Sequence, residues 1–280
     1  MKTFLKINHL SLALLILSLF ALASCSTPRY AYSPSAHNVP VLEKKGDGKL
    51  GAFYSTNLTA DSRLNDYPVT SRTRGADVQG AYAITDNIAI QANYYNRWEK
   101  TTGGPDTVSI TYHRNITELG LGYYMPLSAS RKNIFFQVFL GGGLGKFSFT
   151  DLRPTGSGYF HDANVTKIYI QPGFVYRSKG SFSSAVSLRA SIINFSKIKT
   201  NYSYSQLEDY KLDSLNSRSK VFFEPAFTGS FGLKGIPALR FEFQAGVSFL
   251  AAHNLLDYHP FCLSLGTYMN LGDLLHKKAE

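Results

Sequence analysis

Histidine and carboxylate side chains are the residues of this chain that could carry acid–base chemistry. The candidates are His113, His161, His253, Asp257 and His259, together with Asp151 and Asp162. A histidine held by a carboxylate can activate a serine or cysteine nucleophile when the three groups lie within hydrogen-bond reach. No spacing among these residues matches such a nucleophile–His–acid arrangement. Hydrolase chemistry is therefore an alternative interpretation, and the main prediction is a protein that is not an enzyme.

Metal and phosphate sites are not predicted either. The seven histidines are scattered, and neither they nor the two cysteines form pairs at metal-ligand spacing. The run Gly141-Gly-Gly-Leu-Gly145 would need a following helix to cradle a phosphate, whereas Lys146 to Thr150 continues a strand pattern. Glycines that make room for interior side chains explain the run better. We expect no metal and no non-covalent cofactor.

Cys25 carries the most specific chemical signal. It follows a basic start and an apolar run, Leu10 to Phe20, which is too short for a permanent membrane anchor and is typical of an export signal. The sequence Leu22-Ala23-Ser24-Cys25 resembles the lipobox of bacterial lipoproteins. The resemblance implies that residues 1–24 are a lipoprotein signal peptide and that Cys25 receives a covalent lipid such as palmitate. Ordinary cleavage after Ala23 is the alternative.

The composition restricts which kind of exported protein this is. The chain has 280 residues, of which 44% are hydrophobic, 14% aromatic and 17% charged. Abundant aromatics and only two cysteines exclude a disordered tail, a collagen and a disulfide scaffold. The formal net charge of +10 would suit nucleic acid, but export removes the chain from that partner, and we predict none.

From Gly48 onward the hydrophobic pattern has a period of two residues. Leu239 to Phe249 alternates apolar and polar positions, which places the two sets on opposite faces of a sheet. Most of the predicted strands reach the ~9–11 residues that a tilted strand needs to cross a bilayer. The ten predicted strands are 48–58, 74–85, 88–99, 110–125, 134–150, 166–176, 182–198, 219–231, 239–251 and 260–271.

Long and short connections alternate between these strands. Such alternation is typical of outer-membrane barrels, in which short turns face the periplasm and long loops face outside. Because unpaired backbone groups in hydrocarbon are costly, the sheet must close on itself. The predicted fold is all-β, a closed antiparallel up-and-down transmembrane β-barrel of about ten strands over residues 48–272. Residues 25–47 are predicted to form the acylated cysteine and an extended periplasmic tether, and residues 273–280 a periplasmic tail.

The lipobox at Cys25, a proline-bearing tether and ten alternating strands over residues 48–271 resemble the outer-membrane β-barrel superfamily of Gram-negative bacteria, in a lipid-anchored form. The resemblance implies a lipid-anchored protein of the outer membrane with a periplasmic N-terminus and outer-membrane lipids around it. The omptin proteases also have ten strands, but their paired aspartates have no counterpart in this sequence. The terminal aromatic residue that is common in the superfamily is also missing.

Charged side chains on the polar faces of the strands are predicted to fill the lumen. They are the cations Arg97, Lys167, Arg189 and Arg240 and the anions Glu118, Glu224 and Glu242. The interior of an eight-stranded barrel is just filled by side chains, and ten strands make it little wider. Buried charges of this kind have to pair, because an isolated buried ion is strongly destabilising. We predict a structural salt-bridge network, with a narrow ion path or ligand site as the alternative.

The membrane interfaces are indicated by aromatic residues near the predicted strand ends, because amphipathic rings gather there. They are Tyr94, Tyr95, Trp98, Tyr123, Tyr124, Tyr169, Tyr176 and Tyr268. Basic residues in the short turns would meet anionic headgroups, an envelope protein or a partner on the peptidoglycan side, or would simply be solvated.

The predicted function is that of a non-enzymatic outer-membrane barrel lipoprotein, a structural or interaction component of the cell envelope that presents loops such as Ser203 to Ser217. The first alternative is a soluble periplasmic lipocalin-like lipoprotein that binds an apolar ligand, with Leu239, Phe241 and Phe243 facing inward. The second alternative is a barrel hydrolase with its site at the extracellular rim. The sequence names no ligand and no oligomeric state.

Overall fold

The computed structural model describes residues 29–58, 62–64, 67–103, 108–127, 133–156, 158–178, 181–233, 235–251 and 256–276. Most of these residues are in strands. Two short helices are present, α2 (Tyr204–Asp209) and α3 (Leu271–His276). In the part of the chain that is described, no helix has the length and hydrophobicity needed to cross a membrane.

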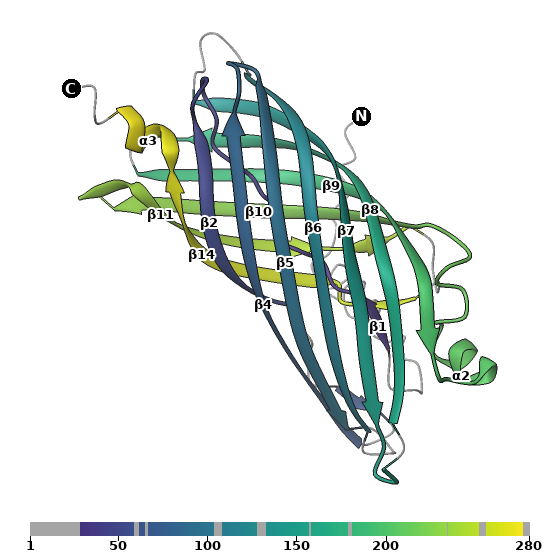
Figure 1. Cartoon of the computed structure of the whole chain (residues 1–280). Helices are drawn as coiled ribbons and strands as arrows, with labels where there is room; N and C mark the ends of the chain where they lie inside the picture. The colour runs from purple at the N-terminus through teal and green to yellow at the C-terminus, as the bar shows by residue number, and fades with distance from the viewer. Residues whose placement is uncertain are drawn as a thin grey trace, which may run out of the picture.

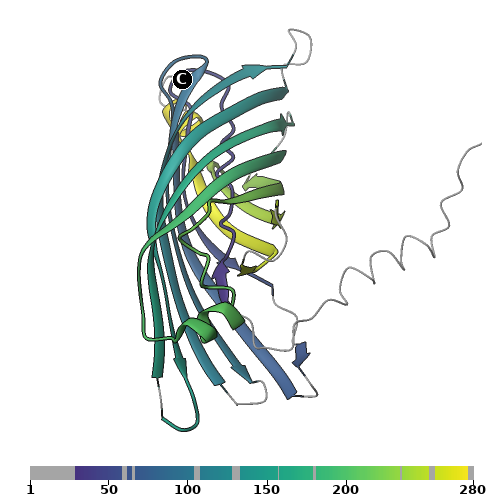
Figure 2. The same cartoon turned by 90° about the vertical axis from the view of Figure 1, so that its right-hand side faces the viewer.

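Ten long strands form one closed antiparallel barrel (Figures 1 and 2). Each strand pairs with the next along the chain, and β14 pairs back onto β2 with Leu263 opposite Thr56 and Asn270 opposite Lys49. The prediction of a closed ten-stranded antiparallel barrel is confirmed. The strands are β2 (Gly48–Thr56), β4 (Tyr67–Ala83), β5 (Ile88–Gly103), β6 (Val108–Pro126), β7 (Ile134–Leu152), β8 (Gly158–Arg177), β9 (Phe182–Thr200), β10 (Lys220–Leu233), β11 (Ile236–Val247) and β14 (Phe261–Asn270).

Four short strands complete the sheet structure. β3 (Ser62–Leu64) pairs with β4, and β12 (Phe249–Leu250) pairs with β10. β1 (Tyr30–Tyr32) and β13 (Asp257–Tyr258) form a small parallel pair that is separate from the barrel wall.

The two-residue period of the sequence sets the chemistry of the two barrel faces. On β11, Phe241 and Phe243 are exposed on the outside, whereas Arg240, Glu242 and Gln244 are buried in the lumen. The same separation of apolar exterior and polar interior is found on β5 to β9. An apolar exterior suits hydrocarbon, as expected for a transmembrane barrel. The alternative in which Phe241 and Phe243 face an interior ligand is therefore wrong.

Half of the aromatic residues predicted to mark the membrane interfaces lie instead inside the barrel. Tyr94, Trp98, Tyr123 and Tyr176 are exposed on the outer face, and Tyr95, Tyr124, Tyr169 and Tyr268 are buried in the lumen. Neighbours such as Tyr94 and Tyr95 cannot share a face, because successive side chains of a strand point to opposite sides.

The two ends of the barrel differ. The turn end carries the connections 84–87, 127–133, 178–181 and 234–235, and the loop end carries 57–66, 104–107, 153–157, 201–219 and 251–260. At the loop end several strands are longer than predicted: β4 begins at Tyr67 and β8 at Gly158, within predicted loops. β2 and β11 end earlier than predicted. The wall is therefore high over β4 to β9 and low over β11, β14 and β2 (Figure 2). At the turn end, α3 occupies the start of the predicted tail.

Residues 29–42 run through the inside of the barrel, so the prediction of an extended periplasmic tether is wrong for them, and only residues 43–45 of this segment are exposed. Arg29, Ala36, Asn38 and Leu42 are almost completely buried. The prediction failed because small and polar residues without a hydrophobic period look like a solvated linker. In this chain the same composition fills a polar lumen.

Candidate functional site

The candidate site is the lumen and the segment of residues 29–47 that occupies it, which we call the plug. The plug enters at the loop end, where β1 pairs with β13 and the His259 N–H donates to the Tyr32 carbonyl. It ends at the turn end, where Leu42 packs with Ala83 and Tyr124. The chain then turns through Gly46, whose φ of 91° favours glycine, and enters β2.

The outer end of the plug is held by a buried ion pair. Arg29 Nη2 lies 2.6 Å from Asp151 Oδ2 near the end of β7, and the Arg29 guanidinium stacks 4.1 Å from the centre of the Tyr210 ring. The Tyr202 hydroxyl donates to the same Asp151 oxygen at 2.7 Å. Burial raises the pKa of Tyr202, which keeps this donor protonated. Residues from β7 and from the loop that contains α2 therefore converge on Arg29.

The middle of the plug makes specific polar contacts with the wall. The His37 ring nitrogen Nδ1 lies 2.7 Å from Ser187 Oγ on β9, and Gln244 on β11 donates to the His37 carbonyl at 2.9 Å. Asn38 donates to Asn93 Oδ1 on β5 at 2.8 Å, and its carbonyl accepts from Gln171 on β8 at 2.9 Å. Since these strands lie on several sides of the barrel, the plug is fixed across the whole lumen.

Four of the predicted lumen charges form one cluster beside the plug. Lys167 Nζ lies 3.1 Å from Glu118 Oε1 and 3.9 Å from Glu224 Oε2. Arg189 lies 3.9 Å from Glu118 and donates mainly to Gln171 Oε1, at 2.7 and 2.9 Å. The plug completes this cluster, because the Tyr32 hydroxyl donates to Glu224 at 2.7 Å.

The other predicted lumen charges are buried in separate places. Glu242 pairs with Lys49, and Arg97 pairs with Asp77. Arg240 has no carboxylate within ion-pair distance among the described residues, and donates to the Ser181 carbonyl at 2.7 Å. The seven predicted residues thus lie inside the barrel without forming a single network.

Sequence reasoning missed several wall charges, Asp77 and Lys49 among them, and the whole plug. Asp77 alternates with Gly75 and Gln79 on the inner face of β4, so the period of two could have identified it. Lys49 could have been identified in the same way on β2. No comparable signal existed for Tyr32, Ser35 or His37, because only the closed barrel brings them against β9 and β10.

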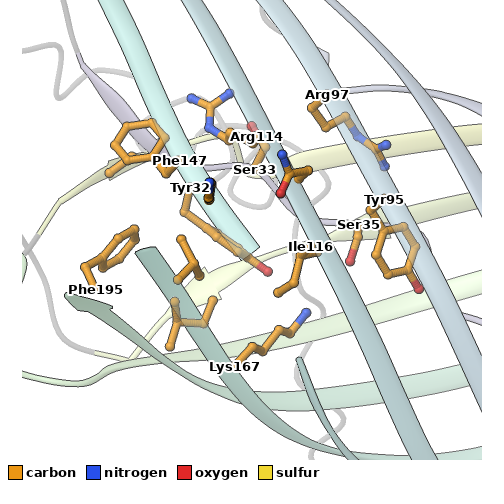
Figure 3. Close-up of a pocket in the computed structure, with 15 residues that line it drawn as sticks. Tyr32, Ser33, Ser35, Tyr95, Arg97, Arg114, Ile116, Phe147, Lys167 and Phe195 are labelled. Carbon is orange, nitrogen blue, oxygen red and sulfur yellow. The ribbon is translucent and has the colours of Figure 1, made fainter. Parts of the chain in front are cut away.

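A small cavity of about 50 Å³ remains between the plug and the wall (Figure 3). It is lined by Tyr32, Tyr95, Arg97, Arg114 and Lys167 among others, and the figure shows these side chains from several strands around one space. The Tyr95 hydroxyl and the Nε atoms of Arg97 and Arg114 have no hydrogen-bond partner among the residues that the structure describes. The volume suits a few water molecules, which such polar atoms hold well.

The histidines and carboxylates considered for catalysis are spread over the loop end. His259 Nε2 lies 2.7 Å from Glu99 Oε1, which also accepts from Ser71, but the second ring nitrogen of His259 has no partner in the described part of the chain. Tyr30 of the plug stacks on the His259 ring at 4.0 Å. No nucleophile is placed for His259 to activate among the described residues.

The other candidates have partners of a structural kind. Asp257 pairs with Lys211 at 2.9 Å, His161 stacks on Phe149, and His113 contacts Asn96 on the strand next to it. Asp162 is exposed on the outer face of β8. His253 and the lipidation candidate Cys25 lie outside the described residues. No group of three or more metal-ligating side chains occurs within the described ranges.

No protein-family model matches this chain, and no curated protein matches it in sequence. Solved structures match it in architecture. The translocator domain of the autotransporter NalP from Neisseria meningitidis aligns with 80% of this chain and 88% of its own, with a TM-score of 0.46 and 11% identity. The outer membrane protease OmpT from Escherichia coli aligns with 80% and 96%, with a TM-score of 0.43 and 12% identity. The outer membrane protein OprG from Pseudomonas aeruginosa aligns with 82% and 97%, with a TM-score of 0.34 and 11% identity.

Proposed function

We propose that this chain is a non-enzymatic, lipid-anchored β-barrel of the outer membrane whose lumen is closed by its own plug. It would act as a structural or interaction component of the cell envelope. The observation that carries the proposal is the plug itself: residues 29–47 pass from the loop end to the turn end of the barrel, and residues 29–42 are buried or half-buried along that path.

The contacts of the plug support a permanently closed lumen. Arg29, Tyr32, Ser35 and Asn38 each contact a wall side chain directly, and three of these contacts involve a charged group of the wall. Hydrogen bonds to charged groups contribute about 1.5–3 kcal/mol each. The remaining cavity of about 50 Å³ has room for a few water molecules, which is too little for a wide pore or a ligand pocket between the plug and the wall.

The loop end supports an interaction role. The connection 201–219 contains α2, which begins with a capping box between Ser203 and Gln206. Tyr204 is 73% exposed on this helix, whereas the ring of Tyr210 packs against Tyr202. A capped helix on an anchored loop presents Tyr204 in a fixed position, which suits a protein partner in the envelope. Outer-membrane lipids are the proposed partner of the apolar wall.

Electrophoresis and conductance together test the proposal. A closed membrane barrel should migrate faster on an SDS gel before boiling than after it, and should stay with membranes after a carbonate wash. The purified protein in a planar bilayer should give no conductance steps. A barrel that shows no gel shift and leaves the membrane would contradict the membrane barrel, and regular conductance steps from the unmodified protein would contradict the closed lumen.

A further inference from the structure

We infer that the amino-terminal end of the mature chain emerges at the loop end of the barrel, which places the lipid of Cys25 at the outer leaflet of the outer membrane. The acyl group itself rests on the proposed function. The path of the chain does not, because it follows from contacts of residues 29–47 alone.

The direction of the plug is fixed by its contacts at three levels. Arg29 meets Asp151 near the last residue of β7, at the loop end. His37 meets Ser187, five residues into β9 from its turn-end start at Phe182, and Leu42 packs with Ala83, the last residue of β4 at the turn end. Reading backward from β2, the chain therefore crosses the lumen and leaves it among the long loops.

The remaining chain is too short to return to the other side. Cys25 precedes Arg29 by four residues, which span at most about 14 Å when fully extended. The stretch from Arg29 to Leu42 already uses more than three times as many residues to cross the barrel. A Cys25 lipid in the inner leaflet would need the plug to leave the lumen, which would strand Asp151 and Glu224 without their plug partners.

We assign the outer leaflet as the surface that the emerging chain end contacts. β1 pairs with β13, which lies between β12 and β14 along the chain. Tyr30 stacks on His259, and Arg29, one residue closer to Cys25, contacts Asp151 at the loop end of β7 and the Tyr210 ring in the connection 201–219. The chain therefore leaves the lumen among the long loops. Because the outer face of the wall is apolar, the lipid around the wall is the apolar phase that an acyl chain at this end can enter.

This arrangement requires the chain end to be threaded through the barrel during assembly. If short turns face the periplasm, a lipid received on the periplasmic side has to pass the barrel before the wall closes. Closure occurs where β14 meets β2, the strand that directly follows the plug. The lipid would pass in time if β14 pairs with β2 only after the plug has entered the lumen.

The experiment places one reactive thiol next to the chain end and asks from which side it can be labelled. In the variant Thr27→Cys, the only other thiols are Cys25, which acylation blocks, and Cys262, which is buried. A membrane-impermeant maleimide is added to intact cells and to permeabilised cells. Thr155→Cys in the connection 153–157 is the reference for the loop end, and Asp86→Cys in the connection 84–87 is the reference for the turn end.

We expect Thr27→Cys to be labelled in intact cells as strongly as Thr155→Cys, with no gain after permeabilisation. Labelling that requires permeabilisation, as expected for Asp86→Cys, would overturn the inference, and so would a thiol that reacts only after denaturation. Incorporation of a palmitate analogue, with Cys25→Ser as control, is measured separately. A surface-labelled chain without palmitate would refute the lipid anchor and support the path of the chain. A palmitoylated chain that is labelled only after permeabilisation would support the lipid anchor and refute the path.

Discussion

Lys49 Nζ lies 2.8 Å from both carboxylate oxygens of Glu242, and this pair bridges the strand at which the barrel closes. Lys49 belongs to β2 and Glu242 to β11, which pair with β14 from its two sides. Both side chains are almost completely buried. Loss of one partner would leave the other charge without compensation in the lumen.

Glu242→Gln should therefore destabilise the folded barrel by about 3–5 kcal/mol, because Lys49 would remain buried and charged. The measurement is the temperature at which the fast-migrating, unboiled form disappears on an SDS gel. The double variant Lys49→Met with Glu242→Leu should recover most of the loss, since it removes both charges. Glu43→Gln is the matched control: its pair with Arg177 is partly exposed, and such pairs contribute about 1 kcal/mol or less.

Removal of the plug should open the barrel to ions. A variant that lacks residues 27–42 joins Cys25 and Ser26 to the turn before β2 and leaves every wall strand intact. It should still migrate as a folded barrel before boiling, at a lower melting temperature, and should give conductance steps in planar bilayers that the unmodified protein does not give. A folded variant without conductance would show that wall side chains alone close the lumen.

The start of the plug should depend on Arg29. In Arg29→Met, Asp151 keeps the bond from the Tyr202 hydroxyl but loses the cation that pairs with it, so the outer turn of the plug should open more often. Hydrogen exchange of residues 30–36 should become faster while exchange in β7 changes little. Arg153→Met provides the comparison, because Arg153 lies in the same region and stacks on Tyr159 without a carboxylate partner in the described part of the chain. Equal effects of the two variants would contradict a specific role of the Arg29–Asp151 pair.

The two neighbouring glycines Gly141 and Gly142 offer a test of lumen packing. A methyl group at Gly141 would lie 2.5 Å from the Tyr169 ring and from a backbone oxygen, whereas one at Gly142 meets only a backbone oxygen at 3.4 Å. Gly141→Ala should therefore cost about 1–3 kcal/mol through overpacking, and Gly142→Ala much less. Melting of the heat-modifiable form measures both. Similar losses in the two variants would indicate that glycine is needed at this place for curvature of β7 and not for room in the lumen.

The sequence by itself determined the wall of the barrel. Leu239 to Phe249 alternates so regularly that only one face can be apolar, and a strand with an apolar face outward and charges such as Arg240 and Glu242 inward specifies a membrane barrel. The strand count and the starts of β5, β7 and β9 followed from the same local pattern. Local periodicity was sufficient because the alternation of apolar and polar residues within each strand shows which of its faces contacts lipid.

Only the tertiary structure decided what lies inside the wall. Residues 29–47 have no hydrophobic period, and the burial of residues 29–42 depends on a lumen that ten strands from the rest of the chain create together. The partners of the predicted charges were undetermined for the same reason: Glu224 receives a bond from Tyr32 and Glu242 one from Lys49, at separations of about 190 residues. A buried polar side chain has to be paired, but its residue type alone does not reveal the partner. The closed barrel supplies that partner by fixing which side chains face each other across the lumen.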